Sequence, residues 1–401
     1  MARTTAVLPA GERITDYISL GVIAKYFPRR IVDDVLQKCQ RESVRERDLP
    51  AHVVVYYVIA LALYMQSSYR EVLRCLLEGL HWLVDPSVPP RVAGKSGISQ
   101  ARTRLGAEPL RTLYDTVARP VASAKTRGAW YRRWRVMSLD GSTLDVADTK
   151  ENDETYGRPS NNRGACAYPK IRFLALLECG THVLCGARMS GYKTSEATLA
   201  AEVVPALGKG MLCLADRLFS NYRLWKAAKQ NGADLLWRVP LRFHFASTKT
   251  LSDGSFLSVL RPSDQDRRAG SEPVVVRVIE YQLKGIEHAE PLYRLITTIL
   301  DAESAPAAEL AALYHERWEI ETALDELKTH LRGSRIVLRS KTPELVEQEF
   351  YGLLLAHLAI RSLMHEAALR ADEDPDRISF RHSVRVVQRN VRRGGSIPPS
   401  A

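Results

Sequence analysis

The chain has 401 residues, of which 45% are hydrophobic and 26% are charged, values typical of a globular protein with two or three domains. A formal net charge of +11 favours a polyanionic partner, and nucleic acid before a membrane surface. The longest apolar stretch, from His52 to Met65, is too short to cross a bilayer, so the sequence predicts no membrane span and a buried helix instead.

The N-terminus and the cysteines indicate a protein of a reducing compartment. The first residues contain no apolar signal-peptide segment, so we expect a cytoplasmic protein. The cysteines show no Cys-x-x-Cys spacing, which predicts reduced core thiols and favours neither a zinc site nor a disulfide framework. They are Cys39, Cys75, Cys166, Cys179, Cys185 and Cys213.

The first part of the chain reads as helical. From 15 to about 125, apolar residues recur at three- and four-residue spacing between polar breaks, which predicts an all-α N-terminal domain over 1–125. Arg102 and Arg104 are expected to be exposed on a short helix, where they would contact DNA. The same pattern is common in helical domains that bind no DNA.

The pattern changes to strands near Trp130. An extended segment, a hairpin around Gly180 and Thr181, a helix capped by Ser195, a strand, a helix and a strand follow in turn over 126–239. Antiparallel strands followed by βαβ crossovers are the order of a ribonuclease-H-like fold, whose ligand face lies at strand ends.

The remaining segments complete the predicted α/β organisation. Residues 240–300 are mostly strand-like and predict a β-rich insertion, and helix returns from Ala305 to about Ala371. The fold class is therefore expected to be a ribonuclease-H-like catalytic core at 126–239 and 301–371, interrupted by that insertion. The all-α domain precedes the core, and a basic tail at 372–401 follows it.

One segment of the last helical region, Tyr314 to Leu331, carries polar residues along a narrow strip. At about 100° per residue, the strip spans about 60° of one continuous helix and lies beside an apolar face. It consists of Tyr314, Arg317, Glu321 and Lys328. Glu319 and Glu326 point away from the strip, toward solvent. The alternative is an ordinary amphipathic helix with surface salt bridges.

Two aspartates end apolar strands of the predicted core. Asp140 follows the strand that begins near Trp134, and Asp216 ends the run at 210–216. Together with Glu321 they make an oxygen-only site suited to two Mg²⁺ or Mn²⁺ ions, which can promote an in-line phosphoryl displacement. Asp145 and Asp148 are nearby competitors, but Asp145 would point to the opposite face of a continuous strand.

These blocks resemble a known family. Tyr314, Arg317, Glu321 and Lys328 match the pattern Y-x2-R-x3-E-x6-K of the DDE transposases of the bacterial IS-four group. "SLDGSTLDVAD" and "CLADRLFSNYRLW" resemble the segments that carry its two aspartates, and the resemblance covers about residues 15–370.

The resemblance implies a DDE triad of Asp140, Asp216 and Glu321, with Tyr314, Arg317 and Lys328 positioning phosphates and the end strand. It implies metal-dependent cleavage at terminal inverted repeats, transfer of the 3′-OH into target DNA, a homodimer on double-stranded DNA, and association with the nucleoid. The alternatives are a stand-alone nuclease and a domesticated DNA-binding protein derived from a transposase.

The C-terminal tail carries arginines at nearly constant spacing and no acid between 377 and 393. A helix over this stretch would place the arginines in a stripe that can follow a phosphate backbone, with Val384, Val387 and Val391 on another side. The arginines are Arg377, Arg381, Arg385, Arg389, Arg392 and Arg393. The alternative is a disordered tail without a role.

Overall fold

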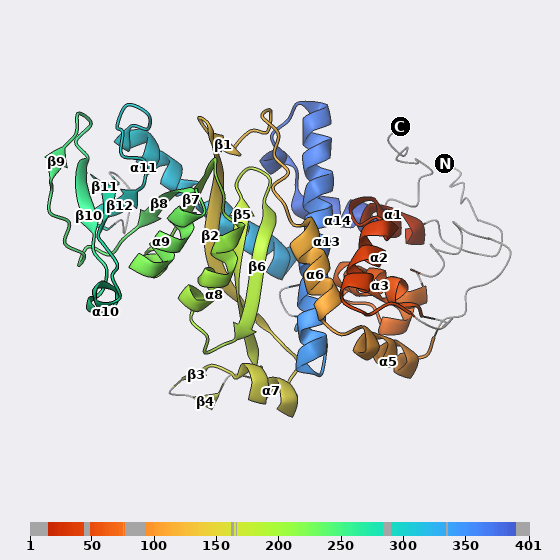
Figure 1. Cartoon of the computed structure of the whole chain (residues 1–401). Coiled ribbons are helices and arrows are strands. Elements are labelled where there is room, and N and C mark those ends of the chain that lie inside the picture. Colours follow the sequence, from red (N-terminus) through yellow and green to blue (C-terminus); the bar gives the residue numbers. More distant parts are fainter. Residues whose placement is uncertain are drawn as a thin grey trace.

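The computed structural model describes residues 15–43, 49–74, 76, 93–161, 164–165, 167–283, 290–333 and 336–389 (Figure 1). The helices are α1 (Thr15–Tyr26), α2 (Arg29–Lys38), α3 (Ala51–Leu63), α5 (Lys95–Leu105), α6 (Glu108–Val117), α7 (Lys150–Tyr156), α8 (Glu196–Val203), α9 (Tyr222–Gln230), α10 (Asp264–Arg268), α11 (Ala307–His315), α12 (Trp318–Asp325), α13 (Pro343–Ala371) and α14 (Phe380–Arg389). Shorter turns are η1 (Val204–Ala206), η2 (Arg217–Phe219), the π-helical η3 (Glu326–Leu331) and η4 (Pro375–Arg377). The strands are β1 (Trp130–Tyr131), β2 (Trp134–Asp145), β3 (Ser160–Asn161), β4 (Gly164–Ala165), β5 (Lys170–Glu178), β6 (Val183–Gly191), β7 (Met211–Ala215), β8 (Asp234–Arg238), β9 (Lys249–Thr250), β10 (Phe256–Leu260), β11 (Val274–Tyr281) and β12 (Tyr293–Thr297).

One mixed sheet organises the molecule, in the order β6-β5-β2-β7-β8-β12-β11-β10-β9. The hairpin β5–β6 is antiparallel and β5 is antiparallel to β2, whereas β2, β7 and β8 run parallel. This is the order of strands and crossovers that the sequence predicts for 126–239. The short strand β7 and the middle of β8, residues 235–237, are apolar because helices cover both faces of a parallel sheet.

The β-rich segment extends this sheet, because β12 pairs with β8 and carries β11, β10 and β9 outward from it. Residues 243–248, which belong to the strand-like stretch predicted at 240–300, form no strand in the structure. Two helices, α7 and α10, were not predicted. Each is short and polar, and each begins at a hydroxyl cap, Thr149 or Ser263, so it forms without the apolar periodicity on which the prediction relied.

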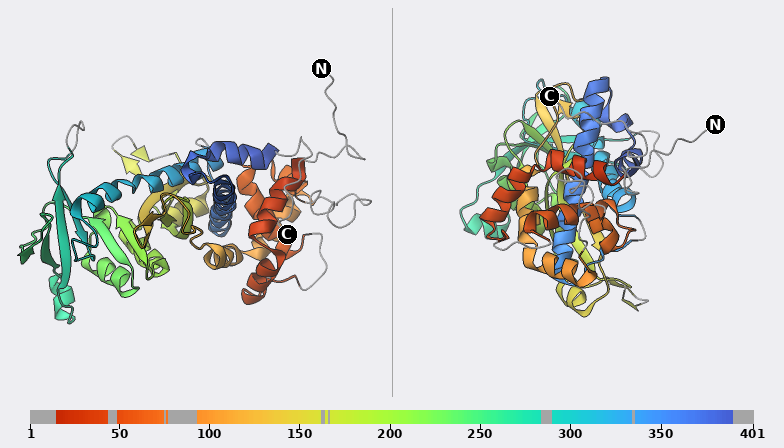
Figure 2. Two further views of the ribbon diagram at one scale, coloured as in Figure 1. Left: turned by 90° about the horizontal axis from the view of Figure 1, so that it is seen from above. Right: turned by 90° about the vertical axis from the view of Figure 1, so that its right-hand side faces the viewer.

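Helices form layers on both sides of the sheet (Figure 2). Helices α8 and α9 cover one face, and α12 and α13 lie on the other. The long helix α13 is buried along most of its length because α3 and α6 pack on the side away from the sheet. A glycine permits the approach of α3, since a Cβ at Gly352 would lie 2.9 Å from the Val58 carbonyl oxygen.

The apolar stretch at 52–65 forms α3, whose side chains are almost all buried, as predicted. Within the described ranges, no helix is long and apolar enough to span a bilayer.

Among the described cysteines, Cys39, Cys179, Cys185 and Cys213 are free thiols, as predicted. Cys75 and Cys166 lie outside the described residues.

The predicted exposure of Arg102 is wrong, whereas Arg104 is exposed. Only 3% of the Arg102 surface is accessible, because α5 turns this side chain toward α13. Its Nε donates to Gln348 Oε1 at 2.7 Å, and its Nη2 donates to Ser340 Oγ and to the Leu345 carbonyl oxygen. The sequence did not reveal this role because every partner lies more than 200 positions away.

We therefore expect Arg102→Ala to lower the free energy of unfolding by about 2–4 kcal/mol, because it leaves buried acceptors on α13 without donors. Arg104→Ala removes the same charge from an exposed position of the same helix and should change stability by less than about 0.5 kcal/mol. Urea denaturation followed by circular dichroism measures both. Equal effects in the two variants would contradict the assigned role of Arg102.

Candidate active site

The two predicted aspartates lie at neighbouring positions in the sheet. The prediction that Asp140 ends its strand is wrong, because β2 continues to Asp145 and Asp140 lies where the neighbouring β7 ends. Strands β2 and β7 are parallel, and their register pairs Leu139 with Ala215. Asp140 is the next residue of β2, and Asp216 directly follows the end of β7. Asp216 also caps the short turn η2 by accepting from the Arg217 N–H. The pairing of two apolar strands thus brings two carboxylates to the same edge of the sheet.

Helix α12 brings Glu321 to this edge through Arg317, which immediately precedes the helix. The Arg317 guanidinium donates from Nη1 to Asp140 Oδ2 at 3.4 Å and from Nη2 to Glu321 Oε1 at 3.1 Å. The Arg317 side chain is only 14% exposed, which makes the bridge stronger than a surface ion pair. The structure therefore joins two acids that are distant in sequence through one cation.

Electrostatics at this edge favour a cation. Burial raises the pKa of Asp140 to about 6, against the opposing effects of the Gly141 N–H and of Arg317. Burial lowers the pKa of Arg317, but the ionisable groups of Tyr314 and of all three acids outweigh it and raise the value overall. The charge of Asp216 thus raises the pKa of the same guanidinium that bridges Asp140 and Glu321. A positive charge is required here for the acids to remain ionised together.

Tyr314 and Lys328 also face the strand ends, although the helix that was predicted to hold them is not continuous. Helix α11 ends at His315, α12 begins at Trp318, and the last turn is π-helical. Tyr314 donates its hydroxyl to the Ala215 carbonyl oxygen at 3.4 Å, and Lys328 Nζ donates to Ser142 Oγ at 2.9 Å. The predicted strip therefore converges on β2 and β7, even though the helical-wheel angles do not apply.

The prediction that Glu319 and Glu326 point to solvent is wrong. Their side chains are only 12% and 6% exposed. Glu319 accepts from the Gly180 N–H, and burial raises its pKa to about 8. Glu326 is paired with Arg361 of α13; burial would raise its pKa, but two histidines and Arg361 hold it far below the usual range. The face of α12 and η3 opposite Glu321 is thus anchored inside the protein.

The competing acids have other partners. Asp145 is paired with Lys170, and Asp148 accepts from Arg158 Nη2 at 2.8 Å. Asp325, the nearest alternative to Glu321 on the helix, accepts from the Thr329 hydroxyl at 2.6 Å and is exposed. Arg217, which follows the second aspartate, pairs with Glu290 at 3.3 Å.

A further carboxylate near Asp140 was missed. Glu196 is the first residue of α8, and a Cβ placed at Gly141 would lie 2.6 Å from its Cδ. Its negative charge contributes to the raised pKa of Asp140. The predicted N-cap at Ser195 located the start of this helix, but only the sheet register places that helix end beside Gly141.

The structure describes the basic tail up to Arg389. Helix α14 begins at Phe380 and packs against α1 and α13 through the buried Phe380, Val384 and Val387. Arg381 and Arg385 are exposed on its other side. Arg377 precedes the helix, in η4, and pairs with Glu373 at 3.2 Å. Val391, Arg392 and Arg393 lie outside the described residues, as does the Arg389 side chain.

Two family models match the chain. One, described as the N-terminal part of the insertion element 4 transposase, matches residues 17–115. The other, described as a transposase DDE domain, matches residues 133–359, which is more than half of the 401 residues. The chain belongs to the IS4 family of DDE transposases. This transposase is therefore a DNA-cleaving and strand-transferring enzyme.

Two individual transposases are also similar in sequence to this chain. The chain is 30% identical over 367 residues to the transposase InsG for insertion sequence element IS4 of Escherichia coli (strain K12), covering 89% of this chain and 80% of InsG. The putative transposase InsZ of the same strain is 25% identical over 230 residues, covering 57% of this chain and 74% of InsZ. Nothing in these matches favours a domesticated protein over a transposase.

Among solved structures, the piggyBac transposase synaptic complex with hairpin DNA aligns with a TM-score of 0.47 and 12% identity. The alignment covers 93% of this chain and 79% of that chain. At this TM-score the likeness carries no argument about function.

Proposed function

We propose that this transposase cuts the ends of its own element and joins the freed 3′-OH to target DNA at a site formed by Asp140, Asp216 and Glu321. The observation that carries the proposal is the double contact of Arg317 with Asp140 and Glu321, beside the strand end that bears Asp216. The surrounding sheet and helices would then be a ribonuclease-H-like core, with 240–300 as its β-rich insertion.

The donor set of these acids suits Mg²⁺ or Mn²⁺, and we propose two ions. All the donor atoms are carboxylate oxygens, which hard divalent cations prefer. Burial raises the pKa of Asp140 to about 6, so its ionised form is favoured by an added positive charge. When bound, such ions supply Lewis-acid stabilisation of the attacking and leaving oxygens. We assign Asp140, Asp216 and Glu321 as their ligands.

The basic residues around the acids would hold DNA. Arg317 neutralises two carboxylates in the free protein, and its planar guanidinium can grip a phosphate bidentately once cations replace it there. Lys328, placed beside Ser142, supplies a point charge on the same side. Tyr314 can donate its hydroxyl to the same backbone. These contacts would position the scissile phosphate over the acids without reading the base sequence.

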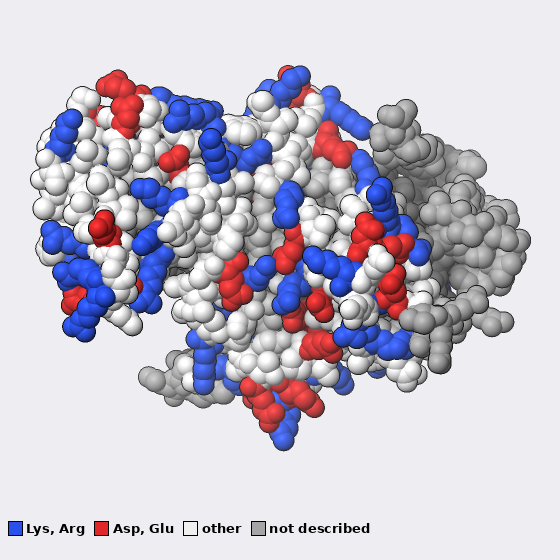
Figure 3. Space-filling view, in the orientation of Figure 1, with Lys and Arg blue, Asp and Glu red and all other residues white. Residues whose placement is uncertain are grey.

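Other parts of the chain would bind more DNA. We propose that the helices of 1–125 bind the terminal inverted repeats, with the exposed Arg104 rather than Arg102 as the contact on α5, and that a homodimer acts on the paired ends. Basic side chains are spread over one face of the molecule and gather near α10, where Arg267 and Arg268 are exposed (Figure 3). This substrate would place the protein with the nucleoid.

The amphipathic α14 supports a role for the tail as a backbone contact. Its apolar side is buried and its Arg381 and Arg385 are exposed, so the arginines are presented on a fixed element. Arg377 is a weaker candidate because Glu373 already pairs with it. We propose that Arg381 and Arg385 hold flanking or target DNA through phosphates.

The acids give the first functional prediction. Asp140→Asn, Asp216→Asn and Glu321→Gln should each reduce cleavage of a terminal-repeat duplex by at least about a thousandfold, because each removes a charged metal ligand. Binding of the same duplex should change by less than about threefold, since acids do not attract phosphates. Gel assays of nicking and of binding at equal protein concentration measure the two quantities.

Asp145→Asn and Asp325→Asn are the matched controls, because each neutralises a nearby acid that has another partner. Both should cleave normally. Cleavage that survives in Glu321→Gln and disappears in Asp325→Asn would move the third ligand to Asp325.

The tail gives the second functional prediction. The double variant Arg381→Gln and Arg385→Gln should bind all DNA more weakly and reduce the slope of log affinity against log salt by about 1 for each phosphate that is no longer neutralised. Truncation before α14 is a poorer test because it removes buried Phe380, Val384 and Val387. Cleavage by complexes assembled beforehand at low salt should persist. Arg377→Gln serves as the comparison, and a salt slope unchanged by the double variant would rule out a role for these arginines in DNA binding.

A further inference from the structure

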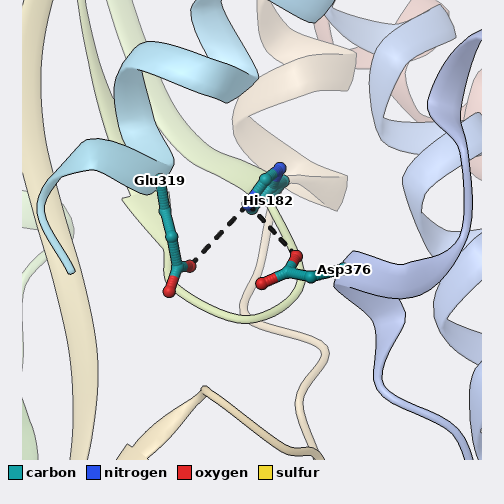
Figure 4. A group of neighbouring side chains, drawn as sticks. All are labelled: His182, Glu319 and Asp376. Carbon is teal, nitrogen blue, oxygen red and sulfur yellow. Dashed lines mark ion pairs between the residues drawn. The ribbon is translucent and has the colours of Figure 1, made fainter.

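A second cluster of ionisable side chains lies where three distant segments meet (Figure 4). His182 comes from the turn between β5 and β6, Glu319 from the start of α12, and Asp376 from η4. One donor atom from each residue lies within 4.8 Å of the others. None of the three belongs to the proposed active site, because Glu319 lies on the side of α12 opposite Glu321 and its bridge to Arg317.

The spacing of the donor atoms fits a small divalent ion. His182 Nε2 lies 3.3 Å from Asp376 Oδ1 and 3.8 Å from Glu319 Oε2. Ligands about 2.1 Å from a tetrahedral Zn²⁺ are about 3.4 Å apart, so little movement is needed to enclose an ion. The imidazole nitrogen among the donors distinguishes the cluster from the oxygen-only set at the active site and favours a transition metal over Mg²⁺.

His182 supplies an independent indication of a ligand. The residue is only 4% exposed, and its Nε2 makes no hydrogen bond within the part of the chain that the structure describes. This nitrogen is directed between the carboxylates of Glu319 and Asp376 (Figure 4). The groups that this nitrogen faces are carboxylates that would themselves be ligands, so an ion bound to it would be shared by all three side chains.

The other ring nitrogen faces both Glu326 and Arg361. His182 Nδ1 lies 3.5 Å from Glu326 Oε1, and Glu326 is itself held by Arg361. A proton on Nδ1 directed at Glu326 leaves the Nε2 lone pair free, which is the carboxylate–histidine–metal arrangement. Arg361 Nη2 donates to Nδ1, which places the proton on Nε2 when no ion is bound. An entering ion would displace that proton, and Arg361 would then donate to Glu326 alone.

Solvent can reach the cluster. A pocket of about 430 Å³ is lined by all three side chains, and also by Thr322, Ser379 and the exposed Trp318. An ion can therefore enter without unfolding, and a water molecule can complete the coordination.

We propose that His182, Glu319 and Asp376 bind one divalent transition-metal ion, separate from the ions that act on DNA. The ion would fasten η4, and with it the basic helix α14, to the hairpin β5–β6 and to the start of α12. Since Glu321 lies two residues after Glu319, a fixed α12 would also hold Glu321 at the sheet edge. The site is structural and takes no part in phosphoryl transfer.

The test uses the full chain carrying Asp140→Asn and Glu321→Gln, which weakens competing binding at the acids, with Zn²⁺ as the probe. Calorimetric titration should find one ion per chain. Adding Glu319→Gln or Asp376→Asn should lower the affinity at least tenfold, and each should abolish the zinc-dependent rise in Tm, which we expect to be a few degrees. X-ray absorption at the zinc edge should show one imidazole ligand.

Glu373→Gln is the matched control, because it neutralises an exposed acid just before η4 and should leave zinc binding unchanged. The substitutions of Glu319 and Asp376 preserve side-chain shape, and the Tm without zinc shows whether each variant is folded. Zinc binding of equal affinity in the parent and both variants, or no binding in the parent, would overturn the proposal. Neither result would depend on DNA cleavage, so the proposed function is tested separately.

Discussion

The guanidinium of Arg317 is the contact on which the arrangement of the site depends. Like charges 4 Å apart repel by about 4 kcal/mol near a protein surface, so carboxylates gather at one edge of a sheet only if a cation lies among them. Arg317 supplies that charge by bridging Asp140 and Glu321. The break between α11 and α12 places it there, at the turn immediately before the helix that bears Glu321. The guanidinium thus occupies the position in which the proposed function requires divalent ions.

The hydrophobic core and the site are joined through α12. One side of this helix and of η3 presents Glu321 and Lys328 to the sheet edge, and the other side buries Glu319 and Glu326. Glu326 is held by Arg361 of the long helix α13, which also packs against α3 of the N-terminal helices. Buried charges thus connect α12 to α13 and, through α13, to the N-terminal helices.

The sequence located the acids and the strip, because each depended on a local pattern. The apolar runs before Asp140 and Asp216 indicated two acids in the core, although β2 continues past Asp140 to Asp145. The spacing of Tyr314, Arg317, Glu321 and Lys328 identified residues that do converge on these acids. The sequence could not reveal contacts between residues that are distant from one another along the chain. The burial of Arg102 requires Gln348, and the proximity of Glu196 to Gly141 requires the sheet register. Glu319 and Glu326 do lie on the side opposite Glu321, but their burial there depends on Gly180 and Arg361, which the local pattern does not reveal.

The central claim is that Asp140, Asp216 and Glu321 form one cation site, in which the Arg317 guanidinium takes the place of the metal ions when DNA is absent. Anomalous diffraction from crystals of the protein with a terminal-repeat duplex and Mn²⁺ tests this claim most directly. The account predicts manganese peaks between the three carboxylates, with Arg317 moved from Asp140 to a DNA phosphate. Manganese bound elsewhere, with Arg317 still bridging Asp140 and Glu321 in the DNA complex, would contradict it.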